Sequence, residues 1–146
     1  MKLAGIDHIV LTVKNLEATR RFYQRVLGME TRIMPNGRTA LHFGRQKINL
    51  HLHGSEVEPR ASSPTPGSAD LCFAIQSRIS DALDELRDLD VSIIEGPVER
   101  NGALGKMVAV RPLSTAGKST PPPPPIAMLP WSWPTTTPAA GPTRTP

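Results

Sequence analysis

The chain has 146 residues, a formal net charge of +4 and one cysteine. This length allows one domain with a substantial core, and a single cysteine excludes an internal disulfide framework and favours a reducing compartment. Three positive charges fall in the last part of the chain, at Arg111, Lys118 and Arg144. The nearly neutral remainder predicts no nucleic-acid partner. No apolar run approaches the roughly 20 residues of a membrane span, and no secretory leader precedes the first strand, so we expect a cytoplasmic protein without membrane contact.

The first predicted strand covers residues 6–13 and carries a histidine on one of its faces. Alternation separates an apolar face from a second face that holds His8, Val10 and Thr12. A lone histidine in a strand is more often a half-buried structural residue than a metal ligand. His8 therefore becomes a candidate ligand only if other parts of the chain support it.

The first half of the chain reads as a strand, a helix and three strands. Asn15 is a suitable N-cap for a helix over 16–27, and Gly28 is suited to end it. Period-two patterns between turn residues predict strands over 29–34, 39–43 and 47–53. Prolines and glycines over 55–68 interrupt any regular pattern and predict a linker.

The second half begins in the same order. We predict a strand over 70–75, a helix over 77–89, and strands over 91–94 and 105–110, with Gly96 and Pro97 breaking the first of these two strands. An offset of 62 residues superposes the strand of His8 on the strand of Asp70, with apolar positions matching apolar ones. The sequence therefore predicts an α+β domain over 1–110. Its two βαβββ modules, 1–54 and 68–110, are joined by the linker 55–67 and form a curved mixed sheet.

The composition changes after Val110. Eleven of the sixteen prolines lie in the last 36 residues, among many Thr, Ser, Ala and Gly residues. Because proline cannot donate to a sheet ladder, we predict that 111–146 is a disordered Pro-rich tail and that the second module lacks its last strand. Loss of that strand would leave the neighbouring strand with an unpaired edge. We therefore expect a weakened fold, or pairing of this edge with another chain.

Polar side chains follow one face of the fourth predicted strand: Asn49, His51 and His53. Such a face either meets water or lines a cavity, and the repeat favours the cavity because His8 and Asp70 share one register. Imidazole and carboxylate groups suit divalent Zn, Ni, Mn or Fe. We therefore predict metal ligands at His8, His51 and Asp70, with coordination positions left for a small-molecule substrate, and substrate contacts at Asn49 and His53.

Two segments at the start of the chain carry a family resemblance. Ile-Asp-His-Ile-Val-Leu-Thr-Val at 6–13 and Asn-Leu-Glu-Ala-Thr-Arg-Arg-Phe-Tyr-Gln-Arg-Val-Leu-Gly-Met-Glu at 15–30 resemble the opening of the vicinal oxygen chelate superfamily. This group includes glyoxalase I, the extradiol dioxygenases, and the fosfomycin and bleomycin resistance proteins. The segments 43–51, 66–72 and 95–98 are similar to the glyoxalase domain-containing protein 5 group, and the resemblance covers about residues 4–110.

The resemblance implies ligand positions at His8 and His51, and at Asp70, where many relatives have histidine. It also implies a last ligand, a glutamate within a segment resembling Asp-Pro-Asp-Gly-Asn-Leu-Ile-Glu, which also takes part in proton transfer. This chain has no such segment and no acidic residue after Glu99. Relatives commonly dimerise by sharing modules, so the resemblance also implies a homodimer.

Three functions are compatible with the sequence. The first is a metal-dependent glyoxalase-like enzyme that chelates vicinal oxygens of a small substrate, with lyase, isomerase or dioxygenase chemistry. The second is a metal-free small-molecule binding module like the bleomycin resistance proteins. The third is an inactive chain that lost the strand bearing the glutamate. Metal analysis separates the first two.

Overall fold

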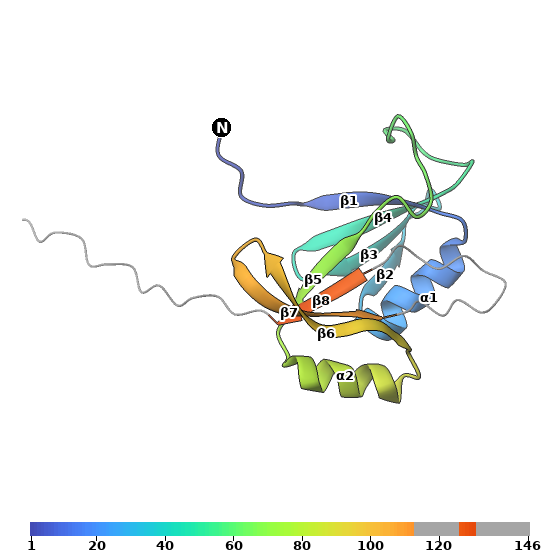
Figure 1. Ribbon diagram of the computed structural model, residues 1–146. Helices are drawn as coiled ribbons and strands as arrows, with labels where there is room; N and C mark the ends of the chain where they lie inside the picture. The colour runs from blue at the N-terminus through green and yellow to red at the C-terminus, as the bar shows by residue number, and fades with distance from the viewer. Residues whose placement is uncertain (113–125, 131–146) are drawn as a thin grey trace, which may run out of the picture.

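The computed structural model describes residues 1–112 and 126–130 (Figure 1). These residues form two four-stranded sheets, ordered β1-β4-β3-β2 and β5-β8-β7-β6. The elements, in chain order, are β1 (His8–Val13), α1 (Leu16–Leu27), β2 (Glu30–Ile33), β3 (Thr39–Phe43), β4 (Gln46–Leu52), β5 (Leu71–Ile75), α2 (Ile79–Asp88), β6 (Ile93–Gly102), β7 (Gly105–Pro112) and β8 (Ile126–Pro130).

Both modules use the same pairing scheme. The first strand of each module runs parallel to its last, β1 with β4 and β5 with β8, and the other neighbours are antiparallel. This confirms the predicted α+β fold with two βαβββ modules and mixed sheets. No helix among the described residues is long and apolar enough to cross a membrane.

Helix α1 begins and ends at the residues that the sequence indicates. The Asn15 side chain accepts a hydrogen bond from the Ala18 N–H at 2.9 Å, which satisfies one of the free donors of the first turn. Gly28 ends the helix in the left-handed conformation, with φ of 62°, which glycine adopts without steric cost. The helix buries Phe22 and Tyr23 and so fixes the side of the first sheet that becomes core.

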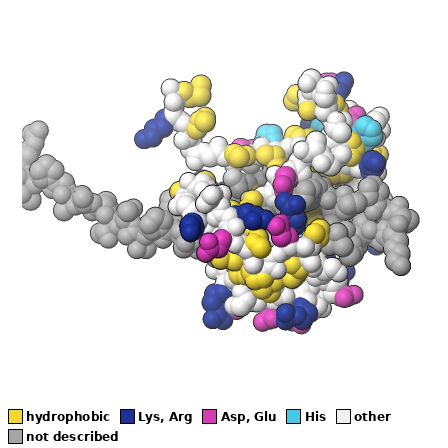
Figure 2. Space-filling model, viewed as in Figure 1, with side chains coloured by type: hydrophobic (Ala, Val, Ile, Leu, Met, Phe, Trp, Pro, Cys, Tyr) yellow, Lys and Arg dark blue, Asp and Glu magenta, His cyan; other side chains and the backbone are white. Residues whose placement is uncertain are grey.

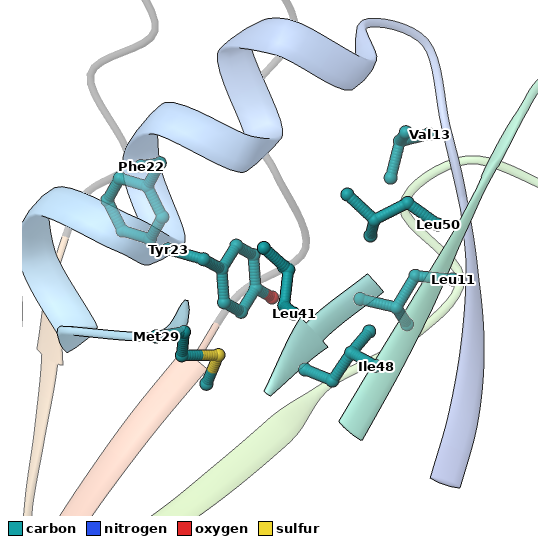
Figure 3. Packing of buried hydrophobic residues seen from close by; sticks show 8 residues of the cluster. All are labelled: Leu11, Val13, Phe22, Tyr23, Met29, Leu41, Ile48 and Leu50. Carbon is teal, nitrogen blue, oxygen red and sulfur yellow. The ribbon is translucent and has the colours of Figure 1, made fainter. Parts of the chain in front are cut away.

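The main core lies between α1 and the first sheet (Figure 3). Tyr23, Leu41 and Ile48 are fully buried there. Side chains of β5 also pack against this cluster, and the ring of Phe73 meets that of Tyr23 edge-on, with centroids 6.5 Å apart. The second module therefore contributes apolar side chains to the main core, while a second, smaller cluster of Leu86, Val91 and Met128 lies within the second module.

The prediction that the second module lacks its last strand is wrong. Strand β8 lies inside the predicted tail and occupies the position between β5 and β7. Its five residues, Ile-Ala-Met-Leu-Pro, place their single proline at the last position, where a missing N–H costs little. Met128 is 5% exposed and packs with Leu86 and Val91. The prediction was made from the proline content of the whole tail, and this short apolar run was therefore not recognised as a strand. The predicted disorder at 113–125 and 131–146 lies outside the described residues.

Strand β6 is longer than predicted. The sequence pattern ended it before Gly96 and Pro97, whereas the strand continues to Gly102 through two register shifts against β7. Gly96 has φ of 108°, and a Cβ there would lie 2.5 Å from the carbonyl oxygen of Ala109. Glycine therefore allows β7 to approach at the irregularity, and the strand bends instead of ending.

Candidate functional site

The polar face of the first sheet lies opposite the face packed on α1. The strand register places His8 beside Lys47 and Lys47 beside His42, in a row across β1, β4 and β3. Further along, Val10 faces Asn49 and Thr12 faces His51. The alternation that the sequence indicated therefore does collect His8, Asn49 and His51 on one surface.

His8 is held by its neighbour in a way that suits a metal ligand. Its Nδ1 lies 2.7 Å from Oδ2 of Asp7, and its side chain is 46% exposed. This hydrogen bond lowers the pKa of Asp7, so the carboxylate stays ionised next to the imidazole. A carboxylate on one ring nitrogen fixes the ring and leaves Nε2 available to a metal. Of the predicted ligands, His8 fits this role best.

His51 lies at the other end of the same face. It is opposite Thr12, four positions along the paired strands from the residue opposite His8, which corresponds to about 13 Å at 3.3 Å per residue. Its side chain is buried, with 9% exposure. His51 and His8 therefore do not converge within one chain. Asn49, two positions closer, is the diagonal neighbour of His8 on β4.

The other two predicted residues each have a charged partner. Asp70, just before β5, has its Oδ2 3.3 Å from a terminal nitrogen of Arg111. His53 follows β4, and its Nδ1 lies 3.3 Å from Oε1 of Glu56. Hydrogen bonds from backbone N–H groups, that of Gly54 among them, lower the pKa of Glu56. His53 thus belongs to a local turn, and its role as a substrate contact stays a prediction.

These residues do not form a complete metal site. Residues 1–112 and 126–130 contain no group of three His, Cys, Asp or Glu side chains close enough to hold a metal ion. Strand β8, where the resemblance implied a glutamate, has only apolar residues. Metal binding by His8, His51 and Asp70 therefore stays a prediction. Within one chain these three side chains do not come together as one group.

Sequence reasoning missed a cleft of about 310 Å³ over the second sheet. Its charged residues form two ion pairs, Asp70 with Arg111 and Glu95 with Arg100. Figure 2 shows basic and acidic side chains lying next to one another on the face in view. The described lining residues are Asp70, Leu71, Cys72, Glu95, Val98, Arg100, Asn101, Met107, Ala109, Val110 and Arg111. The early end predicted for β6 left Glu95 and Arg100 without an assigned face, which is why the cleft was not found.

Cys72 lines the same cleft but is a poor nucleophile there. Partial burial, and secondly the nearby Asp70 carboxylate, raise the pKa of its thiol. The reactive form of cysteine is the thiolate. The cleft therefore presents guanidinium and carboxylate groups as its chemically active side chains.

Comparison with known proteins agrees with this architecture. A family model described as the glyoxalase/bleomycin resistance protein/dioxygenase superfamily matches residues 5–109. The chain belongs to this superfamily. Over 110 residues it is 51% identical to the virulence protein STM3117 of Salmonella typhimurium, a match that covers 75% of this chain and 76% of that protein. It is 44% identical to the glyoxalase domain-containing protein RDO1 of Mycosarcoma maydis, over 75% of this chain and 62% of the fungal protein.

Solved structures of the superfamily show the same fold. The crystal structure of the Salmonella virulence protein superposes with a TM-score of 0.80 at 43% identity, covering 90% of this chain and all of that one. A fosfomycin resistance protein, FosX of Listeria monocytogenes, in complex with Mn(II) and 1S,2S-dihydroxypropylphosphonic acid, superposes with a TM-score of 0.55 at 18% identity. The match covers 88% of this chain and 90% of the FosX chain. At 18% identity it supports only the shared fold.

Proposed function

We propose that this superfamily member binds a divalent metal, one of Zn, Ni, Mn or Fe, through His8 and recognises neighbouring oxygens of a small substrate. The observation that carries the proposal is the Asp7–His8 hydrogen bond of 2.7 Å, because it fixes the imidazole with one ring nitrogen directed to a ligand. A cytoplasmic location remains part of the proposal.

We further propose that a second copy of the chain completes the site. Strands β1 and β5 are the outermost strands of their sheets, and exposed sheet edges favour pairing with another chain. The exposed side chains of His8 and Val10 lie on one such edge, and Asp70 directly precedes the other. A homodimer that joins His8 of one copy to Asp70 of the other would bring two of the predicted ligands together.

The residues of this chain limit the chemistry. A bound divalent metal would supply Lewis-acid stabilisation of negative charge on two neighbouring oxygens of the substrate. Asp7 accepts a hydrogen bond from one ring nitrogen of His8 and so keeps the ring oriented, with the other nitrogen free to face a metal. Asn49, on the strand adjacent to His8, would donate a hydrogen bond to a substrate oxygen. Because β8 offers no carboxylate, proton transfer would need another base, and this favours substrate binding over fast lyase or isomerase turnover.

Metal titration of the full chain tests the proposal. Calorimetric titration with Mn(II) or Ni(II) should show saturable binding. His8→Gln should weaken it by roughly tenfold or more, since altering even the groups that orient a metal ligand usually costs this much. His42→Gln is the matched control, since His42 lies on the same face two strands away. Equal binding by the wild type and His8→Gln would reject His8 as a ligand.

A metal-free binding module is the second candidate. The observation that favours it is the cleft of the second sheet, where Asp70 is already paired with the cation Arg111. A carboxylate that is neutralised within the chain is less available to a metal. Small-molecule binding by protein stripped of metal with EDTA, together with no saturable metal binding, would select this function.

A further inference from the structure

The cleft of the second sheet combines an apolar wall with two guanidinium groups. Leu71, Val98, Met107 and Ala109 form the wall, and Arg100 and Arg111 are the cationic groups. We propose that this cleft binds the carboxylate of a small organic acid, with Arg111 as its main contact. This inference builds on the proposed function, since it names the substrate class as a monocarboxylate with an apolar body.

Both guanidinium groups belong to one antiparallel strand pair. Arg111 of β7 stands opposite Glu95 of β6, and Glu95 is the ion-pair partner of Arg100 on its own strand. The planar fork of arginine matches the two oxygens of a carboxylate. Arg111 uses one terminal nitrogen in its contact with Asp70, so the other donors of its fork can serve a ligand.

The contact between Arg111 and Asp70 is weak enough to be exchanged. The N···O distance is 3.3 Å, longer than the 2.7–2.9 Å that is usual for a charge-assisted hydrogen bond. The Asp70 side chain is 63% exposed, so it can return to water at little cost. The Asp70 carboxylate therefore marks the place that the carboxylate of a ligand would take.

The size and charge of the cleft limit the ligand. A volume of about 310 Å³ is at the lower end of the range for small-molecule sites. Among the described lining residues the two arginines are balanced by Asp70 and Glu95, so these residues supply no net positive charge to hold a phosphate with two charges. A monocarboxylate replaces Asp70 one for one, and its apolar body contacts Leu71, Val98 and Met107.

Titration of the metal-free full chain tests this inference. After EDTA treatment and dialysis, lactate, pyruvate and α-ketoisocaproate are titrated by NMR, with lactamide as the uncharged counterpart. We expect saturable binding of at least one carboxylate and none of lactamide. Arg111→Met should weaken that binding about tenfold, since it removes a charged hydrogen-bond donor, and Asp70→Asn should strengthen it several-fold by removing the competing carboxylate.

Arg78→Met is the matched control, because Arg78 pairs with Asp81 on α2, outside the cleft. It should bind like the wild type. Thermal unfolding of each variant checks that the fold is retained. Equal affinity of Arg111→Met and the wild type, or no preference for the carboxylates over lactamide, overturns the inference.

This experiment is independent of metal binding. The titration contains no metal, so failure of the His8→Gln experiment leaves its result unchanged. The Asp70→Asn variant also distinguishes the metal-site proposal from the carboxylate-site inference, because the two predict opposite changes in affinity. It should weaken Mn(II) binding if Asp70 is a ligand, and it should strengthen carboxylate binding if Asp70 competes for Arg111.

Discussion

The hydroxyl of Tyr23 is buried in the main core and has no hydrogen-bond partner among the described residues. Burial also raises the pKa of this hydroxyl, so it stays neutral. A buried hydroxyl without a partner costs free energy of folding. We predict that Tyr23→Phe raises the free energy of unfolding by about 1 kcal/mol, measured by urea denaturation. Tyr23→Ala should lower it by about 3–5 kcal/mol, because the ring is lost. A less stable Tyr23→Phe variant would show that the hydroxyl has a partner.

Glu17, in the first turn of α1, links the stability of the helix to pH. Hydrogen bonds from Arg20 and Arg21 lower its pKa from 4.5 to about 2. Because the folded-state pKa is the lower one, the carboxylate stabilises the fold above about 4.5, and this contribution is lost as pH falls toward 2. Glu17→Gln should therefore be less stable than the wild type near neutral pH, and the two should converge in acid.

The effect of Glu17 should be small, because the group is exposed and salt screens it. Thermal unfolding at a series of pH values, with and without high salt, measures it. A difference between wild type and Glu17→Gln that is unchanged from neutral to acidic pH would contradict the ion-pair origin of the pKa shift.

At the scale of elements, β8 holds the second module together. It lies between β5 and β7, and Met128 is buried against Leu86. We predict that Met128→Ala costs about 2–5 kcal/mol, as expected for a buried methionine. The exposed Met34 provides the control, and Met34→Ala should change stability little. Equal, small effects of both variants in urea denaturation would show that β8 does not form.

Most elements follow from local patterns in the sequence. Asn15 and Gly28 mark the ends of α1 because capping depends on a few neighbouring residues. The strand of Asp70 could be recognised because it repeats the strand of His8. Strand β8 could not be recognised in this way. Its position between β5 and β7 depends on pairing between residues far apart in the sequence, and the Pro-rich composition around it disfavours a strand.

The candidate site was predictable only in part. Alternation along β4 correctly placed Asn49 and His51 on the face of His8. Alternation does not specify register, and the register separates His51 from His8 by four positions. The ion pair of Asp70 with Arg111 joins residues 41 positions apart in the chain, and no local pattern indicates such a contact.

At the scale of the whole molecule, the two modules place His8 and Asp70 at the outer edges of two sheets. The proposed metal site therefore requires a second copy of the chain to complete it. Variants that each lack one of the two ligands can test this directly, because a mixed dimer of His8→Gln and Asp70→Asn chains contains one intact site and one doubly altered site.

The most direct measurement is Mn(II) binding by this mixed dimer, prepared by co-expression with two different affinity tags. Each variant alone should bind Mn(II) much more weakly than the wild type, and the mixed dimer should recover half of the wild-type stoichiometry. A mixed dimer that binds no better than either variant alone would contradict a site shared between two copies.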